Sequence, residues 1–121
     1  MKSVLSALAV AIALPASADT LGPYTDLLVF GDSLSDGGNI AAATGGITPV
    51  PLFYPNGQFT NGDTWATTLG AAPSLSTFGG TNFAFGGATA ATSGPNQDGF
   101  DIPDFADQRA LYRAAIDGSA L

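Results

Sequence analysis

The 121-residue sequence contains no cysteine and no histidine. Without cysteine it can form neither a disulfide framework nor a thiolate zinc site, and without histidine it has no imidazole to serve as a general base or a metal ligand. Only three basic residues oppose ten acidic ones, all of them aspartates, and the formal net charge is −7. Because a chain this acidic is repelled by a phosphate backbone, nucleic-acid binding is excluded.

Charge of either sign is scarce as well. Charged residues make up 11% of the chain, less than half of the roughly 25% that is typical, whereas the apolar fraction of 45% is ordinary. A charge-driven disordered protein is therefore not expected. The length fits one globular domain at most, so a single core has to account for folding.

The beginning of the chain has the pattern of a secretory signal peptide. Residues 1–3 form a short positive start, Val4 to Leu14 is an apolar run, and Ala16-Ser17-Ala18 has the A-x-A form of a cleavage site. The alternative is a membrane anchor, but the run is well short of the roughly 20 apolar residues that cross a bilayer, and Pro15 interrupts it. We therefore predict a signal peptide over residues 1–18 and export to the periplasm, the cell surface or the medium.

Two segments of the mature chain are predicted to be strands. Leu27 to Phe30 is a continuous apolar run that ends at Gly31, which is typical of a strand buried on both faces in a parallel sheet. Thr81 to Phe85 alternates, with phenylalanines on one face, and runs into Gly86-Gly87. Each predicted strand therefore ends in glycine.

The first two of three predicted helices are short. One is expected over Ile40 to Ala43. Asp63 is expected to cap the other, over Thr64 to Leu69, with Trp65 and Leu69 on its buried side.

The third helix has the best-marked ends. Asp104 is expected to cap a helix that runs to Ile116, with Asp107 in the first turn. Gly118 stands just past the end, where a glycine favours helix termination.

Strands separated by helices favour an α/β domain with a parallel sheet. Loops are predicted over residues 45–62, with room for a small hairpin, and over residues 89–103. A parallel sheet has to be covered on both faces, and the few elements visible here cover little. We therefore interpret residues 19–121 as the N-terminal, truncated part of a larger domain.

Chemistry is expected where the two predicted strands end. Ligands bind outside the carboxyl ends of the strands in an open parallel sheet, so Gly31-Asp32-Ser33 and Gly86-Gly87 would share one edge. The Ser33 hydroxyl would lie near backbone N–H groups and the positive end of a helix dipole, which suits a nucleophile whose product is an oxyanion. Gly87 would let a substrate oxygen reach a backbone N–H with no side chain in the way.

Each of these residues also has a purely structural interpretation. Ser33 could be the N-cap of the helix that follows, with Asp36 three residues on as an imperfect capping box, and Gly87 could be a turn glycine. A series of aspartates could be interpreted as a binding site for a hard metal ion. Two of them are expected at the start of the third helix instead, so no metal site is predicted. The series is Asp98, Asp101, Asp104 and Asp107.

Three stretches resemble, in the right order, the sequence blocks of one enzyme family. Residues 30–39, Phe-Gly-Asp-Ser-Leu-Ser-Asp-Gly-Gly-Asn, resemble the first block of the GDSL lipases and esterases, also called SGNH hydrolases. Residues 56–65 resemble the family's G-R-F-S-N-G-x-x-W segment, and residues 82–88 resemble its second block. The resemblance extends from about Asp26 to Ala115.

The resemblance implies both a fold and a chemistry. The fold is a flavodoxin-like three-layer α/β/α sandwich with a parallel sheet, here incomplete. The chemistry is the hydrolysis of a small-molecule or lipid ester, with Ser33 as the nucleophile and the backbone N–H groups of Ser33 and Gly87 as the oxyanion hole. No metal and no organic cofactor are implied.

The family's remaining blocks are absent from these residues. Its third block, G-x-N-D, supplies an asparagine to the oxyanion hole, and its D-x-x-H block supplies the acid and the base. Losing a triad member leaves only about 10³–10⁴-fold catalysis over water, so residues 1–121 alone are expected to be nearly inert. Two hypotheses follow. The chain is the N-terminal part of an exported GDSL-type ester hydrolase, or it is a non-catalytic binding or interaction protein that retains the front part of the fold.

Overall fold

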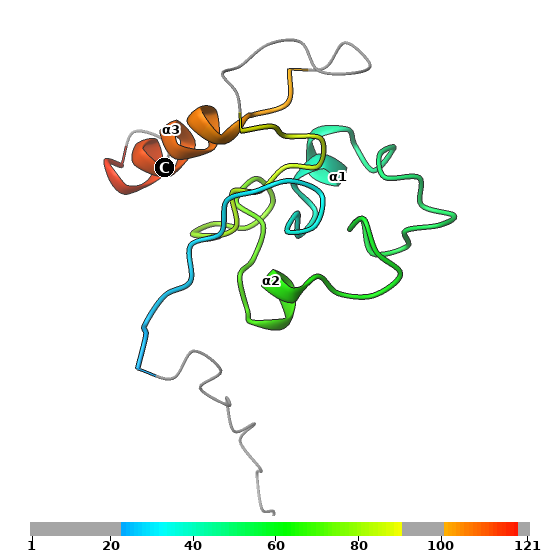
Figure 1. Ribbon diagram of the computed structural model, residues 1–121, viewed down its shortest axis with the longest axis horizontal. Coiled ribbons are helices and arrows are strands. Elements are labelled where there is room, and N and C mark those ends of the chain that lie inside the picture. The colour runs from blue at the N-terminus through cyan, green and yellow to red at the C-terminus, as the bar shows by residue number, and fades with distance from the viewer. Residues whose placement is uncertain (1–22, 91–100, 119–121) are drawn as a thin grey trace, which may run out of the picture.

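The computed structural model describes residues 23–90 and 101–118, and the predicted signal peptide over residues 1–18 lies outside the described residues. The helices of the described part are α1 (Asn39–Ala43), α2 (Trp65–Thr68) and α3 (Phe105–Ile116), joined by loops and turns (Figure 1). None of these described helices is long and apolar enough to cross a membrane.

The two segments predicted to be strands lie side by side and run in the same direction. The N–H of Val29 donates to Thr81 O at 3.0 Å, and the N–H of Phe83 donates to Val29 O at 2.7 Å. One rung further along, the N–H of Phe85 donates to Gly31 O at 3.1 Å. The bridge at Val29 is parallel, which is the orientation that the sequence predicts.

A third segment pairs with the other side of residues 81–85. The N–H of Asn82 donates to Ala72 O at 2.9 Å, and the N–H of Ser74 donates to Asn82 O at 2.9 Å. This bridge is also parallel. The segment that carries Asn82 therefore lies in the middle of three parallel segments.

Within the described residues these segments do not extend into regular strands, and the predicted three-layer sandwich is not present as such. Isolated bridges take the place of the strands predicted over Leu27–Phe30 and Thr81–Phe85. Side-chain amides interrupt the ladder: the N–H of Gly31 donates to Gln108 Oε1 at 2.9 Å rather than to the neighbouring segment. The parallel pairing is thus formed, but over fewer residues than predicted.

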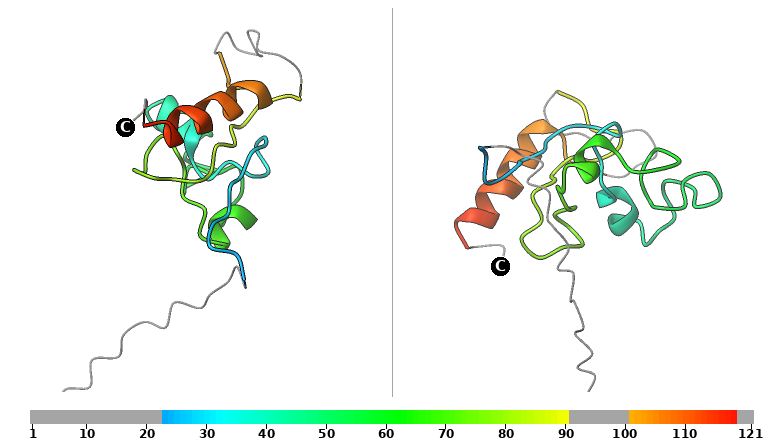
Figure 2. Two further views of the ribbon diagram at one scale, coloured as in Figure 1. Left: turned by 90° about the vertical axis from the view of Figure 1, so that its left-hand side faces the viewer. Right: turned by 90° about the horizontal axis from the view of Figure 1, so that it is seen from below.

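Helices lie on both sides of the paired segments, as Figures 1 and 2 show. On one side, Val29 and Ala84 form a buried cluster with Ala66 of α2 and with Ala71. Because successive side chains of an extended segment point to opposite faces, Phe30 is directed to the other side, toward α3.

Aromatic rings hold α3 against the paired segments. The ring centroid of Phe30 lies 5.8 Å from that of Phe83, 6.0 Å from that of Phe105 and 6.0 Å from that of Tyr112. Phe83 and Tyr112 are themselves 5.7 Å apart with nearly perpendicular rings, an arrangement that aromatic pairs favour. Phe105 and Tyr112 belong to α3, so these contacts fix the helix to the segment that precedes Ser33.

The ends of α3 confirm the prediction. Asp104 is the N-cap, and its N–H donates to Asp107 Oδ2 at 3.2 Å in the first turn. Oδ1 of Asp104 also accepts the N–H of Thr89 at 2.6 Å, which ties the helix start to the chain that follows the predicted second strand. Gly118, with φ of 69°, stands just past the end at Ile116.

The predicted cap of α2 is wrong by one residue. The cap is Thr64, whose Oγ1 accepts the N–H of Thr67 at 3.4 Å, and not Asp63, which is exposed. The N–H of Thr64 is held by Gln58 Oε1 at 2.8 Å, a contact from outside the helix that selects Thr64 over its neighbour. Trp65 is 50% exposed, so its predicted place on a buried side is also wrong.

The loop predicted over residues 45–62 contains no strand, so the small hairpin does not form there. Its backbone bonds close turns instead: Val50 O accepts the N–H of Phe53 at 3.0 Å and that of Tyr54 at 3.1 Å. The second predicted loop, residues 89–103, lies largely outside the described residues.

Candidate active site

Ser33 lies in a tight turn directly after the first paired segment. The carbonyl oxygen of Asp32 accepts the N–H groups of Ser35 at 3.1 Å and Asp36 at 3.0 Å, and Asp32 Oδ1 accepts the N–H of Leu34 at 3.0 Å. Ser33 is half-buried, and among the described residues no hydrogen bond reaches either its hydroxyl or its N–H. Within the described residues, both groups are therefore without a hydrogen-bond partner.

Ser33 is not the cap of the helix that follows, so that alternative is wrong. The helix begins at Asn39 with Gly38 as its N-cap. The carboxylate of Asp36 takes the N–H groups at the helix start: Oδ1 accepts those of Gly38 at 2.8 Å and Asn39 at 2.6 Å, and Oδ2 accepts that of Ile40 at 3.2 Å. Asp36 thereby performs the capping and leaves Ser33 uninvolved.

The same carboxylate joins the turn of Ser33 to the end of the second paired segment. Oδ2 of Asp36 accepts the N–H of Gly86 at 2.8 Å. Together with the bond from Phe85 N–H to Gly31 O, this contact brings the two glycine-marked ends to one edge. Ser33 and Gly87 each stand within a few residues of these bonds.

Gly87 has the backbone conformation that only glycine adopts easily, with φ of 88°. It is exposed, and its N–H makes no hydrogen bond to any described residue. The N–H of Ala88 donates to Phe85 O at 3.1 Å, so Gly87 also lies within a turn. The turn interpretation and the oxyanion interpretation are thus both compatible with this conformation.

One side chain packs closely against each of these two glycines. A Cβ atom at Gly86 would overlap the ring of Phe59, and one at Gly87 would come within 2.7 Å of Ile102 Cδ1. Phe59 belongs to the segment that resembles G-R-F-S-N-G-x-x-W. This segment therefore meets residues 82–88 in space, and Asp36 joins residues 30–39 to the same place.

Trp65 also reaches the turn of Ser33. Its Nε1 donates to Ser35 Oγ at 3.1 Å, and half of its surface stays exposed beside that turn. Sequence reasoning placed this ring on a buried helix face and missed the contact. The sequence also did not predict that Asp36 accepts backbone N–H groups from two separate segments. The one signal for this was the position of Asp36, shortly before the start of a helix.

Asn39 completes the network behind the turn. Its Nδ2 donates to Asn82 O at 2.8 Å and to Ala84 O at 2.9 Å, and its Oδ1 accepts the N–H of Leu75 at 3.0 Å. Asn39 is fully buried. The start of α1 is thereby fixed to the middle paired segment, which limits the movement of the chain on both sides of Ser33.

The described aspartates do not gather into a metal site. No group of three acidic side chains within residues 23–90 and 101–118 lies close enough to hold a metal ion. Asp104 and Asp107 form the start of α3, and Asp101 is exposed. Asp98, the remaining member of the predicted series, lies outside the described residues.

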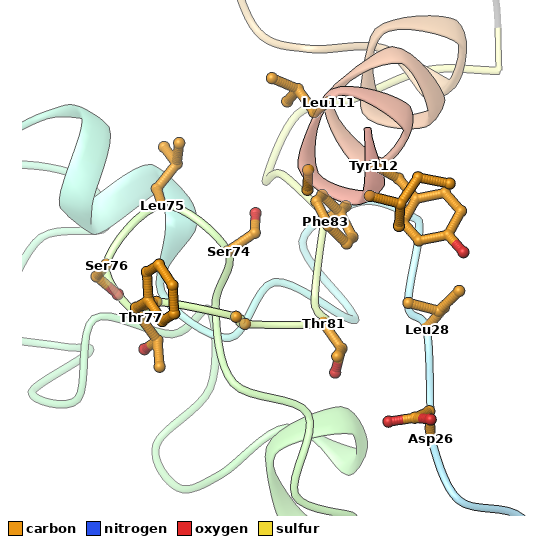
Figure 3. Close-up of a pocket in the computed structure, with 15 residues that line it drawn as sticks. Asp26, Leu28, Ser74, Leu75, Ser76, Thr77, Thr81, Phe83, Leu111 and Tyr112 are labelled. Carbon is orange, nitrogen blue, oxygen red and sulfur yellow. The ribbon is translucent and has the colours of Figure 1, made fainter. Parts of the chain in front are cut away.

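A cavity of about 770 Å³ lies elsewhere, between α3 and the loop that follows α2 (Figure 3). Its lining includes Asp26, Leu28, Thr81 and Leu111, and neither Ser33 nor Gly87 is part of it. The cavity thus lies beside the beginnings of the first two paired segments, whereas Ser33 follows the end of the first. It does not belong to the candidate active site.

Comparison with known proteins gives a family match and a relative that matches part of the chain. The family described as GDSL-like lipase/acylhydrolase matches residues 27–115, which is most of the chain. The secreted effector protein SseJ of Salmonella typhimurium is 43% identical over 74 residues, which are 60% of this chain and 18% of that protein. The chain therefore spans less than a fifth of the length of this curated relative. No solved structure matches the chain. From the family match over residues 27–115, we conclude that the chain belongs to the GDSL-like lipase/acylhydrolase family.

Proposed function

We propose that the chain is the N-terminal part of an exported serine ester hydrolase with Ser33 as its nucleophile. The observation that carries the proposal is the state of Ser33: its hydroxyl and N–H are unbonded among the described residues, while the turn around it is held by Asp32 and Asp36. A free nucleophile on a fixed backbone is what acyl transfer requires. Membership of a lipase and acylhydrolase family supports an ester as the substrate, either a lipid or a small molecule.

In the proposed reaction, Ser33 Oγ attacks the carbonyl carbon of the ester as its proton passes to a base. The carbonyl oxygen becomes an oxyanion, to which the N–H groups of Ser33 and Gly87 donate. Collapse of this intermediate expels the alcohol, which takes up the proton, and leaves the acyl group on Ser33. Water then releases the acid and restores the serine.

We propose that the base of this reaction comes from outside residues 1–121. These residues contain no histidine, and the described aspartates near Ser33 already hold backbone N–H groups. We therefore propose that the acid, the base and a further oxyanion donor are supplied by a segment that follows Leu121 in the full-length gene product. The pattern of residues 1–18, and the secreted relative from Salmonella typhimurium, support export as part of the proposal.

The test is the hydrolysis of p-nitrophenyl butyrate by the full-length gene product. Ser33→Ala is expected to abolish hydrolysis, with a loss of about 10⁴-fold or more in kcat. Ser35→Ala is the matched control, because it removes a hydroxyl from the same turn and loses only the bond from Trp65. Equal activity in wild type and Ser33→Ala would contradict the proposal.

The absence of histidine also favours a second candidate, a non-catalytic binding or interaction protein. The same assay separates the two. If the full-length gene product has no esterase activity on short or long acyl esters and yet folds, the binding function is the better explanation.

A further inference from the structure

The side chain of Gln108 ties α3 to the segment that carries Ser33. Gln108 is fully buried near the start of α3. Its Oε1 accepts the N–H of Gly31 at 2.9 Å, and its Nε2 donates to Gly31 O at 2.8 Å and to Pro103 O at 2.9 Å. Both donors of the amide and its oxygen are thus engaged, and two of the three bonds go to one residue.

These bonds replace one rung of the parallel pairing. Both the N–H and the carbonyl of Val29 pair with residues 81–85, and Gly31, two residues on, would do the same in a regular strand. The carbonyl of Gly31 still accepts the N–H of Phe85, but the N–H of Gly31 donates to Gln108 Oε1. Gly31 has φ of 154°, outside the range of an ordinary strand residue. The chain therefore leaves the paired region at Gly31 and enters the turn of Ser33.

We propose that Gln108 is a positioning residue for the Ser33 nucleophile. Its amide fixes the peptide groups of Gly31, and through them the place of the Ser33 hydroxyl and N–H. This inference rests on the proposed function of Ser33. Gln108 contacts no reacting atom, but a displacement of about 1 Å at a nucleophile can lower the rate about 10²-fold.

Two substitutions separate the hydrogen bonds of the amide from its volume. Gln108→Met keeps the length of the side chain and removes all three bonds. Gln108→Glu keeps an acceptor for the N–H of Gly31 but places a carboxylate oxygen against two carbonyl oxygens. The matched control is Gln58→Glu, because Gln58 is also buried. Its Oε1 accepts hydrogen bonds from Thr64 N–H and Thr67 Oγ1, and a carboxylate oxygen can accept both of them as well.

The first measurement is amide hydrogen exchange on the full-length gene product. In Gln108→Met, protection of the Gly31 amide is expected to fall at least about tenfold relative to protection of the Val29 amide, whose acceptor is Thr81 O. An unchanged Gly31 amide would overturn the inference. An equal loss at Gly31 and Val29 would also overturn it, because it would mean that Gln108 supports the whole fold and not this peptide in particular.

The second measurement is the kinetics of p-nitrophenyl butyrate hydrolysis. Both Gln108 variants are expected to lose about 10²-fold in kcat with KM within about threefold, while Gln58→Glu stays within about threefold of wild type in both. An active wild type with unaffected Gln108 variants would overturn the positioning role alone. A wild type that is inactive, or that is unaffected by Ser33→Ala, would instead refute the proposed function, and the positioning role with it.

Discussion

At the scale of single residues, the carboxylate of Asp36 organises the surroundings of Ser33. It is fully buried and accepts four backbone N–H groups, three at the start of α1 and one from Gly86. Hydrogen bonds to a carboxylate are about twice as strong as neutral ones, and four of them offset part of the cost of burying this group. One side chain therefore caps a helix and also joins the two segments that hold Ser33 and Gly87.

This arrangement predicts a large effect of Asp36→Asn. The amide keeps the size of the side chain but turns an N–H donor toward groups that are themselves donors. We expect a loss of about 2–3 kcal/mol in the free energy of unfolding, since at least one buried N–H is left without an acceptor. Urea unfolding of the full-length gene product measures it, with Asp63→Asn at an exposed position as the control. Equal stability of the two variants would contradict the prediction.

The candidate site residues that the sequence predicts are those that are marked by their local pattern. Ser33 and Gly87 both follow a predicted strand, and the parallel pairing brings their segments together. The roles proposed for them stay predictions until activity is measured. Gln108 was not predicted, because its partner Gly31 is 77 residues away and nothing local distinguishes it from any other helical glutamine.

At the scale of elements, α2 shows how a contact from outside a helix decides its first residue. Asp63 and Thr64 are both good capping residues by type, and the sequence offers no means of choosing between them. Thr64 is the cap because Gln58 holds its N–H, which fixes the extended conformation that a cap requires. By contrast, α3 could be predicted at both ends, because Asp104 and Gly118 mark the termini without help from distant residues.

The choice of cap can be tested by Thr64→Val. This change keeps the shape of a buried side chain and removes the oxygen that accepts the N–H of Thr67. The free energy of unfolding is expected to fall by about 1 kcal/mol, as for other lost caps. Asp63→Ala, at the position first predicted to be the cap, is expected to change it by less than about 0.5 kcal/mol. If denaturant titrations show a larger loss of stability for Asp63→Ala than for Thr64→Val, Asp63 is the cap and the prediction is wrong.

At the scale of the whole molecule, the described residues bury few large apolar side chains. The cluster between α2 and the paired segments consists of Val29 and three alanines. Several large apolar side chains are mostly exposed, among them Phe78 at 87% and Leu52 at 83%. The parallel pairing could be predicted from the sequence because apolar runs that end in glycine are a local signal. The extent of the strands could not, because it depends on long-range contacts from side chains such as Gln108 and Asn39.

So small a core predicts that residues 19–121, produced alone, will not form a rigid fold. Hydrophobic burial must offset the conformational entropy of every ordered residue, and the buried apolar side chains of the described residues are few: three alanines with Val29, Ile40, Phe83 and Phe85. We expect poorly dispersed amide NMR signals and binding of the dye 8-anilinonaphthalene sulfonate, with helical circular dichroism partly retained. The full-length gene product, measured under the same conditions, is expected to show dispersed signals and little dye binding. Well-dispersed signals from residues 19–121 would mean that these residues are a stable unit, and would favour the binding function over the hydrolase.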